Sequence, residues 1–238
     1  MTQHIGIVAC TAEGAALCYR TICSEGEILL GRYVHPEITM HTYPLHEYMR
    51  RIEKEDWDGV ADLMSASAEK AARAGADFII CPDNTIHQAY DRAVQISSLP
   101  WLHIAEEVAA EAAQRQYRRV GLLGTRYLME GPVYPPKLTT RNLEVEIPGE
   151  HSLGRIHQII INEVIHGHLT SASRCYLMEV IWQMREQGCD AVILGCTELP
   201  LLIKQKYAAL PLLDSTRILA KAALRRAIVY AGSVPNRA

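Results

Sequence analysis

The chain repeats itself, and this internal repeat restricts the folds that it can adopt. Residues 75–85 (GADFIICPDNT) lie over residues 188–198 (GCDAVILGCTE). Two further pairs of segments match in the same order: 5–10 with 120–125, and 100–103 with 211–214. At 238 residues, the chain has room for two domains of about 110 residues each. The repeat therefore predicts two similar half-molecules that face each other across one cleft.

Short apolar runs alternate with segments of helical period along the whole chain. The runs predict strands over 5–9, 37–41, 78–81, 101–104, 120–124, 192–195 and 211–213. The helical period predicts helices over 57–73, 104–115, 154–165, 171–187 and 215–230. Alternating strands and helices form parallel sheets with right-handed crossovers. The predicted fold class is α/β, with two pseudo-symmetric open parallel-sheet domains, helices on both faces of each sheet, and the active site in the interdomain cleft.

The domain boundaries have no linker or low-complexity segment to mark them. We expect the chain to leave the first domain near residues 98–100 and to return near 208–211, because the last strand and helix resemble the end of the first half. The first domain is then discontinuous, 1–98 plus 211–238, and the second spans 99–210. Gly75 and Gly188 each follow a predicted helix and precede a strand, where a left-handed C-cap residue is expected.

The composition argues against several classes of function. The net charge is −3 with 21% charged residues, and no basic stripe with interleaved aromatics suggests a nucleic-acid partner. No apolar run reaches the roughly 18 residues that span a bilayer, and the amino terminus lacks the pattern of a signal peptide. We therefore expect a soluble cytoplasmic protein with no membrane partner.

The seven cysteines and ten histidines suggest neither a disulfide framework nor a metal site. The cysteine number is odd, and none stands in a CxxC pair or a metal-like cluster with histidine. His166 and His168 are the densest histidine pair, but a spacing of two does not place both rings on one helical face. We expect reduced thiols and no metal.

Two side chains capable of proton transfer follow equivalent predicted strands. Cys196 comes after a buried strand and before a predicted helix start, where unpaired backbone N–H groups favour a thiolate. The alternative is one more buried cysteine. Asp83 occupies the equivalent strand end, where the alternative is a helix N-cap.

Short polar side chains lie near these two residues and could hold a carboxylate group. Asn84, Thr85, Thr125 and Thr197 combine small donors with nearby backbone N–H groups, although each of them alone is more often a cap or turn residue. A distal carboxylate would need a cation, for which the candidates are Arg50, Arg51, Arg126, His166 and His168. No motif selects one of these five, and solvated surface charge is the alternative for each.

Together these segments resemble the aspartate/glutamate racemase family. The resemblance runs from Ile5 to Ala227 and rests on residues 74–87, on 122–125 followed by Tyr134, on 193–202 (ILGCTELPLL) and on 214–216. It implies two α/β domains related by a pseudo-twofold axis, a PLP-independent amino-acid racemase without any cofactor, and a homodimer. In such enzymes two cysteines flank the α-carbon: one removes its proton and the other returns a proton to the opposite face. The resemblance also implies that the Asn-Thr and Thr-Glu pairs, here Asn84-Thr85 and Thr197-Glu198, bind the α-carboxylate.

The chain departs from the family pattern at the first cysteine, which is Asp83 here. The turn over residues 9–14 is also altered. A carboxylate with a reference pKa of about 4 is a weaker base than a thiolate of about 8.5. We therefore expect an asymmetric pair, with Cys196 the better base and protonated Asp83 the better acid.

Three functions follow from this pattern. The first is a racemase or epimerase of an acidic amino acid of the aspartate/glutamate type, using Cys196 and Asp83. The second is a decarboxylase or other isomerase of a dicarboxylic acid that uses Cys196 alone. The third is an inactive protein that only binds an amino acid or dicarboxylate. In each case the partner is a small-molecule carboxylate, whose side chain and stereochemistry the sequence does not specify.

Overall fold

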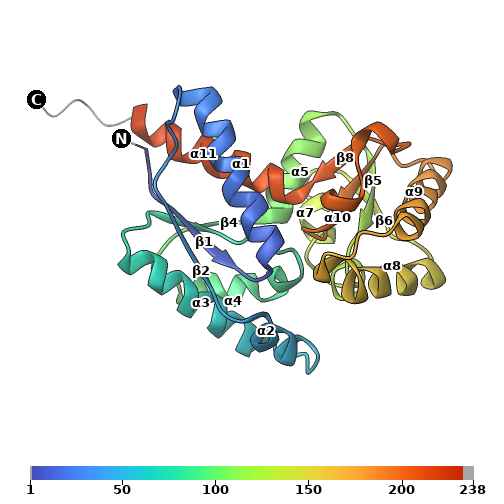
Figure 1. The fold of residues 1–238 in the computed structure, drawn as a ribbon, viewed down its shortest axis with the longest axis horizontal. Coiled ribbons are helices and arrows are strands. Elements are labelled where there is room, and N and C mark those ends of the chain that lie inside the picture. Colours follow the sequence, from blue (N-terminus) through green and yellow to red (C-terminus); the bar gives the residue numbers. More distant parts are fainter. Residues whose placement is uncertain (1, 233–238) are drawn as a thin grey trace, which may run out of the picture. The chain divides into compact units, whose positions relative to one another are not determined.

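The structure, a computed structural model, describes residues 2–232, with side chains through residue 228 (Figure 1). It consists of two compact units: unit 1 is Met1–Ile104 with Thr216–Ala238, and unit 2 is Ala105–Ser215. Each unit is built on a four-stranded sheet in which the paired strands are parallel. The predicted α/β class with two parallel sheets is confirmed.

Unit 1 has the strand order β2-β1-β3-β4. Its strands are β1 (Ile5–Ala9), β2 (Ile38–Thr42), β3 (Phe78–Ile80) and β4 (Trp101–Leu102). Its helices are α1 (Ala12–Leu30), α2 (Leu45–Ile52), α3 (Trp57–Arg73), the 3-10 helix η1 (Thr85–Ala89), α4 (Tyr90–Ile96) and α11 (Ser215–Gly232), which begins at the unit boundary.

Helices cover both faces of this first sheet. On one face, the core joins Ile5 and Ile7 to Ile22 of α1 and Leu219 of α11 (Figure 1). On the other face α3 lies so close to β1 that a Cβ atom added at Gly6 would come within 3.1 Å of the Ala71 methyl group. The close packing needs a glycine at this point of the strand.

Unit 2 has the strand order β6-β5-β7-β8. Its strands are β5 (Arg119–Leu123), β6 (Glu144–Glu146), β7 (Ala191–Leu194) and β8 (Leu212–Asp214). Its helices are α5 (Ile104–Gln114), which begins at the unit boundary, α6 (Arg126–Met129), α7 (Pro135–Thr139), α8 (Glu150–Asn162), η2 (Val164–His166), α9 (Ser171–Glu186), α10 (Leu199–Leu202) and η3 (Gln205–Tyr207).

The sequence repeat is also a structural repeat. The matched segments become β1 and β5, β3 and β7, and β4 and β8, which hold the same places in the two strand orders. Gly75 and Gly188 both have positive φ, +96° and +87°, as a left-handed C-cap requires. Asp77 accepts a hydrogen bond from the His4 backbone N–H (2.7 Å), and Asp190 accepts one from that of Arg118 (2.7 Å). Each carboxylate therefore anchors the start of the first strand of its own half.

The chain crosses between the units a few residues later than the predicted boundaries. Strand β4 pairs with β3 in the first sheet, and β8 pairs with β7 in the second. The boundaries at 98/99 and 210/211 therefore separated each strand from its sheet, because the matching segments 100–103 and 211–214 each close their own half. The crossings fall between Ile104 and Ala105 and between Ser215 and Thr216. Residues 1 and 233–238 of the predicted first domain lie outside the described residues.

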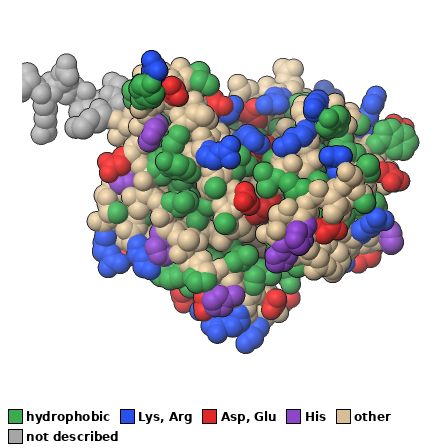
Figure 2. Space-filling model, in the orientation of Figure 1, with side chains coloured by type: hydrophobic (Ala, Val, Ile, Leu, Met, Phe, Trp, Pro, Cys, Tyr) green, Lys and Arg blue, Asp and Glu red, His purple; other side chains and the backbone are tan. Residues whose placement is uncertain are grey.

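Basic and acidic side chains lie interspersed on the face shown in Figure 2. All seven cysteines are thiols, and within the described residues no group of three or more His, Cys, Asp or Glu side chains is arranged to hold a metal ion. Over the same residues, no helix combines the length and the apolar character needed to cross a membrane.

Candidate active site

Asp83 lies just beyond β3, at the carboxyl edge of the first sheet. Its side chain is 8% exposed, and its Oδ1 atom accepts a hydrogen bond from the Ile86 backbone N–H at 3.2 Å. One carboxylate oxygen thus caps the first turn of η1, although the N-cap position itself is Asn84. This bond also fixes the direction of the carboxylate. Asn84 is buried beside it, and Thr85 is half-buried at the start of η1.

His87 braces the backbone at Asp83. Its Nδ1 atom lies 2.6 Å from the Asp83 carbonyl oxygen, and the Ile104 backbone N–H donates to its Nε2 atom at 3.2 Å. Because Nε2 accepts, the proton sits on Nδ1 and the ring is neutral. The ring is buried and stacks on Tyr90. His87 stands in the family-like segment 74–87, but its bracing role depends on the fold and could not be predicted from sequence.

Two further groups lie near Asp83. Burial, and secondarily the Asp83 charge, raises the pKa of the Cys81 thiol well above its usual range, so Cys81 stays protonated and serves as packing. Burial also raises the pKa of Tyr48, with smaller contributions from Cys81, Cys10 and Asp83. These four groups therefore interact at one edge of the first sheet. We call Cys10, Tyr48, Cys81, Asp83 and Asn84 the Asp83 half-site.

Cys196 lies at the equivalent edge of the second sheet, one residue after Gly195. It is 7% exposed, and its Sγ atom donates to Glu198 Oε2 at 3.1 Å. The Thr197 hydroxyl donates to the same oxygen at 2.9 Å. Glu198 is 2% exposed, so its carboxylate is held between these two donors. The helix that follows Cys196, α10, has only four residues. The Cys196 thiol donates its hydrogen bond to the Glu198 carboxylate.

A buried hydroxyl group bonds to the end of β7, just before Cys196. The Ser215 hydroxyl donates to the Leu194 carbonyl oxygen at 2.8 Å, and Tyr134 hydrogen-bonds to Ser215. Burial raises the pKa of Tyr134, so its hydroxyl keeps its proton. A Cβ atom added at Gly195 would come within 3.0 Å of the Leu123 carbonyl oxygen. The backbone at the end of β7 is therefore packed closely against the end of β5, and glycine fits there without displacing a neighbour.

Thr125, the remaining predicted site residue, follows β5. Its Oγ1 atom accepts a hydrogen bond from the Leu128 backbone N–H at 3.3 Å, so it caps α6. Thr125, Cys196, Thr197 and Glu198 follow the second sheet's central strands, β5 and β7, and we call these four the Cys196 half-site. Asp83, Asn84 and Thr85 likewise follow β3 in the first unit. The predicted residues therefore form two groups, one in each unit.

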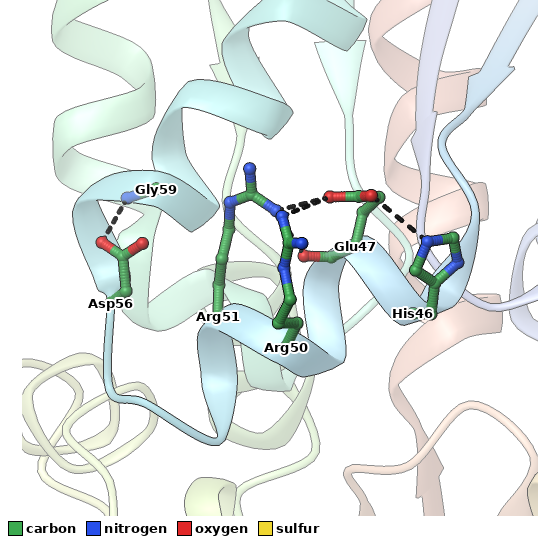
Figure 3. Close-up of polar contacts among 6 residues, drawn as sticks. All are labelled: His46, Glu47, Arg50, Arg51, Asp56 and Gly59. Atoms are coloured by element: carbon green, nitrogen blue, oxygen red, sulfur yellow. Dashed lines mark hydrogen bonds and ion pairs between the residues drawn. The ribbon is translucent and has the colours of Figure 1, made fainter.

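The three candidate arginines are already engaged by acidic side chains. Arg51 donates to both the carbonyl and the Oε2 atom of Glu47, at 2.7 and 2.8 Å, and Arg50 approaches the same carboxylate at 3.2 Å (Figure 3). These partners, Arg51 first, lower the pKa of Glu47. Arg126 pairs with Glu130 at 2.9 Å and Glu150 at 2.8 Å.

The two candidate histidines are exposed. His166 ends η2, and His168 comes after the turn residue Gly167. The structure therefore shows an acidic partner for each arginine and an exposed position for each histidine, and it selects none of the five as a clamp for a distal carboxylate.

Known proteins resemble this chain both in sequence and in fold. Residues 29–223 match the family model described as Asp/Glu/Hydantoin racemase. The chain is 28% identical over 198 residues to the broad-specificity amino-acid racemase RacX of Bacillus subtilis, covering 82% of this chain and 84% of that protein. A putative Asp/Glu racemase from Yersinia pestis has a similar structure, with a TM-score of 0.87, 32% identity and coverage of 95% and 99%. For an aspartate racemase homologue from Pyrococcus horikoshii the TM-score is 0.82 and the identity 29%, with coverage of 96% and 100%.

Proposed function

The chain belongs to the Asp/Glu/Hydantoin racemase family, and from that premise we propose that it is a cofactor-independent racemase or epimerase of an acidic amino acid in which Cys196 and Asp83 exchange the α-proton. Family membership supports an amino-acid isomerase. Family membership does not supply the acidic substrate or the Cys196–Asp83 pair, and both are parts of this proposal.

The observation that carries the proposal is the equivalence of the two positions. Asp83 follows β3 and Cys196 follows β7, which are matching strands of the repeat, and both side chains are nearly buried. Each is also oriented by a hydrogen bond, Asp83 from the Ile86 N–H and Cys196 to Glu198. Inversion at a carbon requires one proton-transfer group on each face. We propose that these two residues serve opposite faces of the same α-carbon.

The proposed reaction keeps one proton on the pair. With one enantiomer, the Cys196 thiolate takes the α-proton while protonated Asp83 donates its proton to the opposite face. The C–H bond breaks, an S–H bond forms, and the proton of Asp83 becomes the new α-hydrogen. With the other enantiomer, Asp83 as carboxylate is the base and the Cys196 thiol is the acid. A buried donor such as Asn84 would stabilise the carbanion through the α-carboxylate.

Glu198 has a role that differs from the carboxylate binding implied by the family resemblance. Its Oε2 atom already accepts hydrogen bonds from Cys196 and Thr197, and a buried carboxylate repels a second one. We propose that Glu198 orients the Cys196 thiol through this hydrogen bond and does not itself bind the substrate.

The test is α-proton exchange in heavy water. The purified protein is incubated without added cofactor with L- and D-aspartate and L- and D-glutamate, and the α-proton signal is followed by NMR alongside chiral analysis. Exchange with inversion is the expected result. Exchange without inversion would mean one working base, with Asp83 as a binding group.

Absence of exchange with all four amino acids would overturn the proposal. CO₂ release from a malonate-type diacid would then identify the single-cysteine decarboxylation. Assembly as a homodimer and a cytoplasmic location belong to the same proposal, and light scattering of the purified protein tests the first.

A further inference from the structure

The hydroxyl group of Tyr48 is an unsatisfied polar group at the Asp83 half-site. The Tyr48 side chain is fully buried, and its Oη atom has no hydrogen-bond partner among the residues that the structure describes. A buried hydroxyl that lacks a partner destabilises the folded state, so such groups are rare unless something else satisfies them.

The fold places this hydroxyl where ligands bind in open α/β sheets. Tyr48 lies on α2, which follows β2, and its electrostatic neighbours Cys10, Cys81 and Asp83 follow β1 and β3. All three strands are parallel neighbours in the order β2-β1-β3, so their carboxyl ends share one edge. Small ligands bind at this edge in sheets of this type.

The side chain is also held in place by packing. Tyr48 and Ile52 are the buried residues of α2, one turn apart, while Glu47, Arg50 and Arg51 form an ion-pair cluster on the same short helix (Figure 3). Packing of the aromatic ring therefore fixes the position of the hydroxyl group. Because burial raises the pKa of Tyr48, the hydroxyl keeps its proton and is a donor at neutral pH.

We propose that Tyr48 is a substrate-contact residue, whose hydroxyl donates a hydrogen bond to a carboxylate oxygen of the bound amino acid. This assignment rests on the proposed function and adds to it a neutral donor in the Asp83 half-site. A neutral donor suits this half-site, because the candidate arginines of the same unit, Arg50 and Arg51, already pair with Glu47.

The test compares Tyr48→Phe with a matched control. Tyr176→Phe removes another buried hydroxyl that has no partner among the described residues, but it lies on α9 beneath Arg155, outside both half-sites. For wild type and both variants we would measure Tm, the affinities for L- and D-aspartate, L- and D-glutamate, and α-proton exchange in heavy water. We expect Tyr48→Phe to weaken binding of the exchanged amino acid, or raise its KM, about 10- to 100-fold. Its Tm should equal or exceed that of wild type, and Tyr176→Phe should match wild type throughout.

Each other result has a definite meaning. If wild type exchanges an amino acid and Tyr48→Phe keeps the same affinity and KM, the Tyr48 assignment is wrong while the racemase proposal stands. If Tyr48→Phe lowers Tm by several degrees, the hydroxyl has a structural partner such as a buried water, and the assignment is also wrong. If wild type neither binds nor exchanges any of the four amino acids, the proposed function fails and the assignment fails with it.

Discussion

At the scale of single residues, the repeat was the most useful signal in the sequence. Asp83 and Cys196 could be predicted because they occupy equivalent positions in the two halves of the repeat, where a difference between the two side chains is easy to see. The contact between Cys196 and Glu198 could not be predicted, since it depends on how the turn after β7 directs two side chains. The Tyr48 hydroxyl, which has no hydrogen-bond partner in the described part of the chain, was equally hidden, because hydrogen-bond pairing depends on packing.

Cys196→Ala tests the first residue of the pair. Loss of a positioned acid–base group lowers turnover by a factor of about 10² to 10⁴, so exchange should fall by at least that lower factor. The fold should lose only about 1 kcal/mol, since one hydrogen bond to Glu198 disappears. NMR exchange and thermal melting measure the two effects. Cys189→Ala, at another buried thiol of unit 2, is the control, and activity retained by Cys196→Ala would remove Cys196 from the mechanism.

Asp83→Cys tests the second residue. It replaces the weaker base by a thiol and should raise racemisation by about tenfold or more, because a better matched pair improves general acid–base catalysis. It should also lose about 1 kcal/mol of stability, because sulfur replaces the carboxylate that caps η1 through the Ile86 N–H. Chiral analysis with time measures the rate. Asp83→Asn keeps an N-cap side chain without a transferable proton, and it should be inactive. Lower activity of Asp83→Cys on the true substrate would make Asp83 a specialised acid.

At the scale of elements, several periodic segments were predicted well and others were missed, including the 19-residue helix α1, which no predicted helix covers. The helix expected over 57–73 is α3 to the residue, and the strand expected over 192–195 is β7 within one residue. Strand β6 was missed because Glu144–Glu146 is charged at both ends and has no apolar run. In the folded sheet β6 pairs with β5. Such tertiary contacts can form a strand from a segment whose own sequence does not indicate one.

Asp190 gives a pH prediction for one such element, the start of β5. The backbone N–H groups of Arg119 and Arg118 hold its pKa below the usual 3.8. A lowered folded-state pKa contributes stability above the unfolded value, and this contribution is lost as the pH falls through the folded value. Asp190→Ala should therefore cost up to about 1 kcal/mol at pH 7, or about 2–4 °C in Tm. The difference from wild type should shrink below pH 3.8.

Thermal melts at several pH values check this prediction. Asp62→Ala, at an exposed position of α3, should give no comparable difference at any pH. A Tm difference for Asp190→Ala that stays constant down to low pH would mean that the carboxylate charge does not contribute.

At the scale of the whole molecule, unit 1 is held together by segments from both ends of the sequence. Leu219 of α11 packs in the same core as Ile5 and Ile7. Leu219→Ala should cost about 2–5 kcal/mol and should lower amide protection in β1 and β3, far away in sequence. Hydrogen exchange read by mass spectrometry measures this. Leu177→Ala, equally buried in α9, should instead lower protection within residues 105–215, and an unchanged unit 1 in Leu219→Ala would contradict the packing.

The discontinuity of unit 1 also has a consequence during biosynthesis. Unit 2 is one continuous stretch, Ala105–Ser215, that the ribosome delivers whole, whereas α11 emerges last. The nascent first sheet must wait for α11 while all of unit 2 is translated, on the order of ten seconds at 5–20 residues per second. During that delay Ile5, Ile7 and Phe78 lack their cover from α11. The yield of native protein in a cell should therefore depend on translation speed and on chaperones that shield this unfinished apolar face.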